Sequence, residues 1–186
     1  MSWISIKILN LFGWQLVGSL PNEKKFVVII APHTSNWDFF MFILVKFAFK
    51  LKVTFIGKHS IFIGPIGWLL KKLGGIPVER SSNHNVVDTI AKEFDKRQNM
   101  IFGLSPEGTR SYLDHWKSGF YHIAKKANVP LVLAFLDTKT KTIGWGPCIK
   151  LTDNKEKDLI KIADFYQDKI GFKPYKYSKP QFRKHA

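Results

Sequence analysis

The chain has 186 residues, which is enough to bury one substantial core but short for two, so a single domain is expected over residues 1–186. Its 29 Lys and Arg residues against 14 Asp and Glu residues give a formal net charge of +15, and 45% of its residues are hydrophobic. This composition excludes a disordered basic tail protein and indicates a folded domain with an anionic partner: nucleic acid, anionic lipid or a phosphorylated substrate. The single cysteine, Cys148, excludes an intrachain disulfide and a zinc site built from several cysteines.

Residues 1–22 begin with a segment rich in indole and aliphatic side chains. No stretch reaches the roughly 18 to 20 uninterrupted apolar residues that a membrane-spanning helix needs. The segment also lacks the basic start and the small-residue cleavage site of a signal peptide. We expect a short amphipathic helix here, which either lies in a membrane interface or packs on the core of this domain. Its apolar residues are Trp3, Ile4, Ile6, Ile8, Leu9, Leu11, Phe12 and Trp14.

Apolar runs that are typical of buried strands alternate with helical segments across the central core, residues 26–136. The runs cover residues 26–30, 53–56, 76–78, 100–104 and 131–136. The clearest helical pattern lies at 83–97, where apolar residues repeat on one face. This alternation predicts an α/β domain with a mostly parallel sheet flanked by helices. Ligands of such sheets bind beyond the carboxyl ends of the strands, so the polar segments that follow these runs are candidate sites.

The segment HTSNWD at residues 33–38 follows the first apolar run. Ser35 and Asp38 have the spacing of a capping box, which places Ser35 at the N-cap and Asp38 in the first helical turn. His33 then lies in the loop before the helix, and this corner lets its imidazole meet the carboxylate. A carboxylate that fixes the tautomer of an imidazole leaves the other ring nitrogen free to accept a proton. His33 is therefore a candidate general base with Asp38 as its orienter, although capping alone would account for Asp38.

The segment SPEGTRS at residues 105–111 follows a later apolar run. Ser105 is not expected to be a hydrolase nucleophile, because Glu107 stands where the motif G-x-S-x-G needs its second glycine. A base without an enzyme nucleophile suggests that the hydroxyl of the substrate is the group that loses its proton.

The same segment is a candidate anion site. Gly108 lets the backbone approach a ligand closely, the Thr109 hydroxyl can donate, and Arg110 offers a planar fork for phosphate. Lys117 is a plausible further phosphate contact, and Arg80 ends another apolar segment, GGIPVER. The alternatives are a polar turn and solvated cations. The other histidines show no metal-binding spacing, so no metal site is expected.

The tail after Asn154 contains one more helical pattern and then a basic end that reaches residue 186. This end is either a solvated terminus or a contact with an anionic membrane surface. Its cations are Lys173, Lys176, Lys179, Arg183 and Lys184.

Taken in order, four of these segments resemble the glycerolipid acyltransferase family with the H-x4-D motif, the 1-acylglycerol-3-phosphate acyltransferase group. HTSNWD resembles its first block, GGIPVER its second, PEGTRS its third and VPLVLA, from residue 129, its fourth. The resemblance implies that His33 activates an acceptor hydroxyl and that Asp38 orients it. It also implies that Arg80, Glu107, Gly108 and Arg110 bind glycerol phosphate. No covalent acyl-enzyme and no cofactor are implied.

The resemblance implies transfer of a fatty acyl chain from acyl-carrier protein or acyl-CoA to a lysophospholipid, most directly 1-acylglycerol-3-phosphate, giving phosphatidic acid. The protein would then lie peripherally on the cytoplasmic face of the cell membrane. Departures from the family pattern at Pro32, Pro77, Glu79, Ser105 and Leu133 leave the acceptor open, so another lysophospholipid, an amino-acid-linked lysolipid or glycerol-3-phosphate are alternatives. A basic membrane-surface or nucleic-acid binding module without catalysis is the alternative from another class. Nucleic acid is not expected as a partner, because the aromatic residues lie inside apolar runs and are not interleaved with cations.

Overall fold

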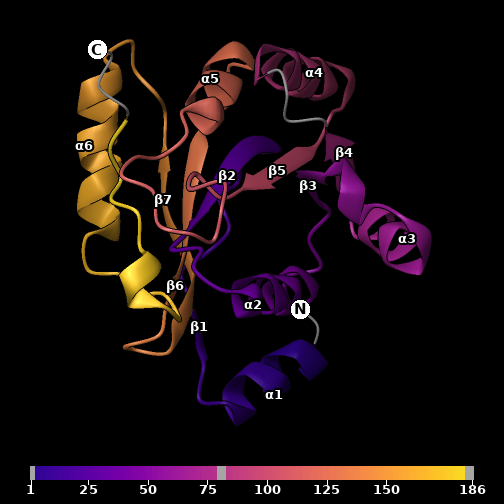
Figure 1. The fold of residues 1–186 in the computed structure, drawn as a ribbon, viewed down its shortest axis with the longest axis vertical. Coiled ribbons are helices and arrows are strands. Elements are labelled where there is room, and N and C mark those ends of the chain that lie inside the picture. Colours follow the sequence, from indigo (N-terminus) through magenta and orange to yellow (C-terminus); the bar gives the residue numbers. More distant parts are fainter. Residues whose placement is uncertain (1–2, 79–82, 183–186) are drawn as a thin grey trace.

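A seven-stranded sheet lies at the centre of the computed structural model, which describes residues 3–78 and 83–182 (Figure 1). Every neighbouring pair of strands is parallel except β6 and β7. The predicted α/β fold with a mostly parallel sheet is confirmed, and the edge strand β1 and its neighbour β7 are additions that the sequence did not predict. In spatial order the strands are β1 (Gln15–Val17), β7 (Thr142–Ile149), β6 (Leu131–Asp137), β2 (Lys25–Ala31), β5 (Met100–Leu104), β3 (Val53–Lys58) and β4 (Gly75–Val78).

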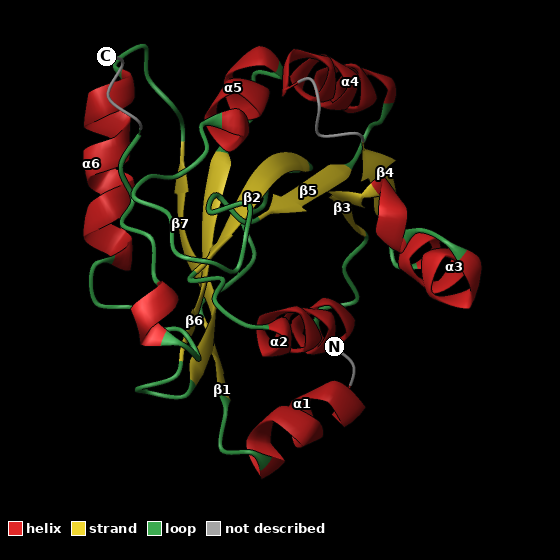
Figure 2. Cartoon of the chain, in the orientation of Figure 1, coloured by secondary structure: helices red, strands yellow, loops and turns green. Residues whose placement is uncertain are grey.

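Helices cover both faces of this sheet (Figure 2). One face carries α1 (Trp3–Leu11) and α2 (Asn36–Ala48), and the other carries α4 (Asn83–Lys96), α5 (Gly119–Lys126) and α6 (Lys155–Tyr166). Strand β2 serves both layers, because Val27 and Ile29 belong to the core under α4 to α6 while Val28 belongs to the core under α2. The uninterrupted apolar run of β2 is thus explained by burial on both sides.

Helix α1 is the amino-terminal helix that was expected either to lie in a membrane interface or to pack on the core. Its Leu9 is fully buried in the core beneath α2, whereas Trp3 and Leu11 are exposed. The helix ends at Leu11, and Trp14, which follows it, is buried in the same core. One side of α1 therefore packs on the domain, and its opposite side remains uncovered.

Helix α3 (Gly64–Lys72) and the preceding 3₁₀ turn η1 (His59–Ile61) stand at the far edge of the sheet beside β4 (Figure 1). The large apolar side chains of residues 59–72 are mostly exposed: Ile61, Ile63, Ile66, Trp68 and Leu69. Within the residues described, no helix has both the length and the apolar character to cross a membrane.

The connections that leave the adjacent strands β2 and β5 run to opposite sides of the sheet. From β2 the chain continues into α2 on one face and then to β3, whereas from β5 it continues through α5 on the other face to β6. The carboxyl ends of the two strands lie side by side, with Ile29 paired to Leu104. A crevice at such a switch point is the usual ligand site of a parallel sheet.

Candidate active site

The loop after β2 enters α2 through the predicted capping box. The Ser35 side chain accepts from the backbone N–H of Trp37 at 3.3 Å, and the Asp38 carboxylate caps Ser35 in return. This second capping bond runs from the Ser35 N–H to Asp38 Oδ2 at 2.7 Å, and the same oxygen also accepts from the backbone N–H of Thr34 at 2.6 Å. These bonds satisfy donors that a helix start leaves without intrahelical partners. They also hold the Asp38 carboxylate against the loop that carries His33.

The His33 imidazole meets this carboxylate as the sequence predicted. His33 Nδ1 lies 3.2 Å from Asp38 Oδ2. The Asp38 side chain is only 3% exposed, whereas that of His33 is 25% exposed. A carboxylate opposite Nδ1 favours a proton on that nitrogen, which leaves Nε2 as the acceptor. The dyad thus has a buried orienter and a base that a substrate can reach.

Glu107 lies beneath the same loop, although it comes from the segment after β5. Its Oε1 accepts from the backbone N–H of His33 at 2.8 Å, and the residue is fully buried. Burial raises the pKa of the Glu107 carboxyl to about 8, with a smaller contribution from the nearby Asp38 charge, and the His33 N–H opposes this shift. Glu107 therefore supports the backbone of the base. The resemblance had implied that it binds glycerol phosphate, but in this structure its carboxyl contacts His33.

The remaining residues of the candidate anion site lie in the loop after Glu107. Gly108 has a φ of +65°, and a Cβ built there would come within 2.8 Å of Lys117 Cδ, so the Lys117 side chain lies across this turn. The Thr109 hydroxyl oxygen accepts from the backbone N–H of Ser111 at 3.2 Å, and Arg110 is exposed. Glycine at this position permits both the left-handed turn and the close approach of Lys117. The loop therefore presents two accessible cations beside the turn that carries Glu107.

The structure brings His33, Asp38 and Glu107 into direct contact and places Gly108 against Lys117. Arg80 lies outside the described residues. Within the described parts of the chain, no three His, Cys, Asp or Glu side chains gather as a metal ion would require.

Two contacts near the site had no signal in the sequence. The Tyr166 hydroxyl, from α6, lies 3.1 Å from the Ile29 carbonyl oxygen in β2 and 2.8 Å from the Ala134 carbonyl oxygen in β6. The backbone N–H of Lys173 donates to Thr34 Oγ1 at 3.0 Å, next to His33. Both partners come from the tail, where the sequence pattern indicated only a helix and a basic end.

A small apolar cavity of about 30 Å³ lies between α2 and the sheet and reaches Asp38. Its lining includes Pro32, Phe42 and Trp145. Pockets that enclose small organic ligands have volumes of roughly 300 Å³ or more, so this cavity is far too small for a fatty acyl chain.

Comparison with known proteins identifies the family of this chain. A model of the family described as Acyltransferase matches residues 17–134, which include the His33 loop and the Glu107 loop. The chain belongs to the acyltransferase family. The resemblance inferred from the HTSNWD and PEGTRS segments is thereby confirmed.

A solved structure shares the fold of this acyltransferase. It is the crystal structure of the 1-acyl-sn-glycerophosphate acyltransferase PlsC from Thermotoga maritima, with a TM-score of 0.60 and 18% sequence identity. The similarity covers 87% of this chain and 73% of that chain. No curated protein sequence matches the chain.

Proposed function

We propose that this protein transfers a fatty acyl chain from an acyl thioester, acyl-carrier protein or acyl-CoA, to the free hydroxyl of a lysophospholipid. The observation that carries this proposal is the contact of His33 Nδ1 with Asp38 Oδ2, while among the described residues no serine hydroxyl or cysteine thiol is hydrogen-bonded to the His33 imidazole. The acceptor that fits best is 1-acylglycerol-3-phosphate, whose phosphate suits the cations beside the Gly108 turn. The similarity of fold to PlsC supports the same choice.

The reaction needs one base and one nucleophile, and the acceptor supplies the nucleophile. His33 Nε2 removes the proton from the acceptor hydroxyl as its oxygen attacks the thioester carbonyl carbon, and Asp38 stabilises the imidazolium that forms. The tetrahedral intermediate then collapses, the C–S bond breaks, and the leaving thiolate takes the proton from His33. The new ester bond therefore forms without a covalent acyl-enzyme and without a cofactor.

The anionic acceptor is proposed to bind over the loop that follows Glu107. Arg110 can form paired hydrogen bonds to a phosphate, and Lys117 and Arg80 add positive charge. The Gly108 and Thr109 backbone lines this turn. The cavity beside Asp38 is too small for the acyl chain, which is therefore proposed to bind outside it.

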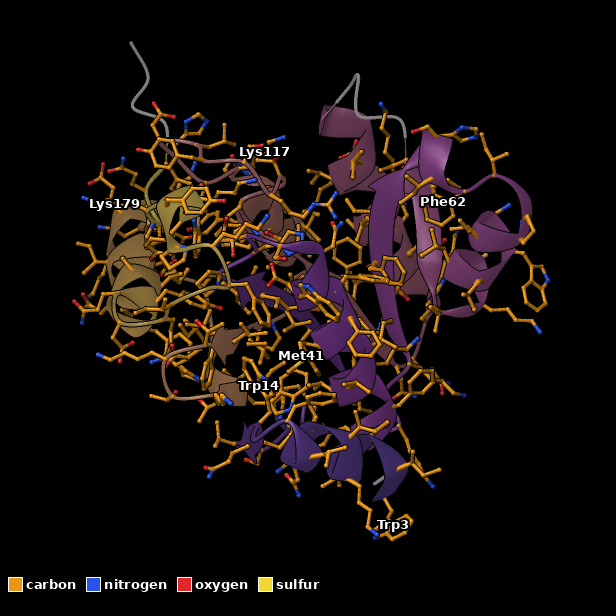
Figure 3. The ribbon with its side chains drawn as sticks, turned by 60° about the horizontal axis from the view of Figure 1, so that its bottom comes forward. Trp3, Trp14, Met41, Phe62, Lys117 and Lys179 are labelled. Carbon is orange, nitrogen blue, oxygen red and sulfur yellow. The ribbon has the colours of Figure 1, made fainter. Side chains whose placement is uncertain are left out.

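The exposed apolar side chains of α1 and of α3 are proposed to rest on an anionic membrane, at the cytoplasmic face of the cell membrane. Each helix exposes a tryptophan with a lysine ammonium over its ring: Lys7 Nζ lies 3.7 Å from the Trp3 ring centre, and Lys72 Nζ lies 4.0 Å from that of Trp68. Figure 3 shows Trp3 projecting away from the body of the protein at the end of α1. Indole and ammonium groups together are typical of side chains at head-group depth.

The test of acyl transfer incubates purified protein with an acyl thioester and a panel of lysolipids, and follows thiol release and product mass. Wild-type protein is expected to release thiol only when an acceptor is present and to yield the diacyl product. His33→Ala is expected to abolish transfer while circular dichroism stays unchanged. Transfer by a folded His33→Ala protein would refute the assignment of the base. Tight, salt-dependent nucleic-acid binding without thioester consumption would favour the binding module instead.

The test of membrane contact compares two exposed isoleucines, one on α3 at the β4 edge of the sheet and one on α6 at the other side of the molecule (Figure 1). Ile66 on α3 is 69% exposed and Ile160 on α6 is 62% exposed. Ile66→Asp should weaken co-sedimentation with vesicles of phosphatidylglycerol and phosphatidylcholine roughly 10- to 150-fold, because one buried aliphatic side chain contributes about 1.5–3 kcal/mol. Ile160→Asp should leave vesicle binding unchanged. Equal effects of the two substitutions would show that α3 is not the contact.

A further inference from the structure

The segment formed by residues 171–182, called here the C-terminal strap, returns from α6 across the candidate active site. Its first residues contact the loop that carries His33. Gly171 is buried, and a Cβ built there would lie 2.7 Å from Thr34 Oγ1 and 3.0 Å from Pro32 Cβ. Together with the bond from the Lys173 N–H to Thr34 Oγ1, this close approach fixes the strap to the residues on either side of His33.

The far end of the strap is bonded to the loop that follows the anion site. The fully buried Ser178 accepts from the backbone N–H of Leu113 at 3.0 Å through Oγ, and from Trp116 Nε1 at 2.8 Å through its carbonyl oxygen. The Gln181 carbonyl oxygen accepts from the Trp116 backbone N–H at 2.7 Å, and Trp116 pairs with Phe182 in a parallel bridge. Lys117, which lies over Gly108, is the next residue along this loop.

The middle of the strap lies near Glu107. The Tyr177 hydroxyl donates to the Tyr166 carbonyl oxygen at 3.3 Å. Burial raises the pKa of Tyr177 to about 12, and the Glu107 carboxyl nearby adds to the shift. The strap thus passes close to the residue that supports His33 between its two attachment points.

We propose that the C-terminal strap is a positioning segment that sets the distance between the His33 base and the loop that binds the acceptor. The strap lies wholly outside residues 17–134, the part of the chain that the acyltransferase family model matches. The loop that carries His33 follows β2, and the loop that carries Gly108 and Lys117 follows β5. The strap is a third segment of the chain, and it is hydrogen-bonded to both loops. The inference rests on the proposed acyl transfer, because its kinetic consequence requires that reaction.

The kinetic test moves one end of the strap at a time. Gly171→Ala inserts a methyl group against Thr34 and Pro32, so it should displace the base and lower kcat roughly 10- to 100-fold with little change in the acceptor KM. Ser178→Ala removes the hydroxyl oxygen that accepts a hydrogen bond from the Leu113 N–H. It should therefore raise the KM for the acyl acceptor severalfold and change kcat less. Gly119→Ala is the matched control, since nothing lies within 4 Å of its added Cβ, and both parameters should stay within twofold of wild type.

A second pair of variants covers the case in which Gly171→Ala fails to fold. Thr34→Val removes the oxygen that accepts from Lys173, whereas Thr34→Ser keeps it, so kcat should fall in the first and recover in the second. A role in stability alone predicts lower melting temperatures with unchanged kinetics of the folded fraction. That result, or the same kinetic change at both ends of the strap, would overturn the inference.

A measurement that needs no turnover separates this inference from the proposed function. The backbone amide resonances of His33 and Thr34 in ¹H–¹⁵N spectra should shift in Gly171→Ala, and those of Leu113 and Trp116 should shift in Ser178→Ala. Gly119→Ala should leave all four in place. If wild-type protein transfers no acyl group, the proposed function fails, while these shifts still decide whether the strap holds both loops. Unmoved resonances would refute the strap as a positioning element.

Discussion

Glu107→Gln replaces the buried carboxyl group under the His33 loop with an amide of nearly the same shape. The glutamine carbonyl oxygen can still accept from the His33 N–H, which is the bond that Glu107 Oε1 accepts at 2.8 Å. What the substitution removes is the titration of the group. Comparison of the two proteins therefore isolates the effect of one buried carboxyl on stability.

The sign follows from the raised pKa. An unfolded glutamate ionises near its ordinary pKa of 4.5, whereas burial raises the pKa of Glu107 in the folded protein to about 8. Between these values the folded state binds the extra proton, so the free energy of unfolding falls as pH rises through this window and levels off above it. From pH 5.5 to 7.5 the wild-type protein should lose about 2 to 3 kcal/mol more than Glu107→Gln.

The assay is urea denaturation followed by circular dichroism at half-unit steps across that pH range. Titrating groups that do not interact with Glu107 contribute equally to both proteins, so the difference between the two curves carries the prediction. Glu23→Gln, at an exposed glutamate, is the matched control and should run parallel to wild type. Parallel curves for wild type and Glu107→Gln would refute the reasoning, because they would mean that Glu107 ionises alike in both states.

Substitutions at two further positions, Asp38 and Gly108, test the geometry of the site. Asp38→Asn keeps an oxygen for the Thr34 and Ser35 N–H groups but removes the charge facing His33, so kcat should fall by about 10²- to 10⁴-fold with a small change in melting temperature. Asp38→Ala should lose a further ~1 kcal/mol of stability as the cap is lost, measured by urea denaturation. Gly108→Ala should raise the acceptor KM, because its Cβ would lie 2.8 Å from Lys117 Cδ. Gly64→Ala shares the positive φ (+59° against +65°) but has open space, so it should show the backbone penalty without the change in KM.

The local half of the site was predictable from the sequence. The apolar runs mark strands that are buried on both faces, and the residues Ser35 and Asp38 have the spacing of a capping box. This box turns the chain at the end of β2, so the contact between His33 and Asp38 follows from residues only five positions apart. Interactions of this range depend on backbone geometry that the sequence pattern encodes directly.

The tertiary structure alone decided the contacts between distant segments. The bond between Glu107 and His33 spans 74 positions and that between Lys173 and Thr34 spans 139, and both depend on which strands are neighbours in the sheet. Periodicity shows that a strand or helix exists but not which loop its end will meet. The sequence therefore left the tail as either a solvated terminus or a membrane contact, and its hydrogen bonds to the loops after β2 and β5 became visible only in the structure. The sequence by itself determined the dyad and the parallel sheet, whereas the support around His33 was decided by long-range packing.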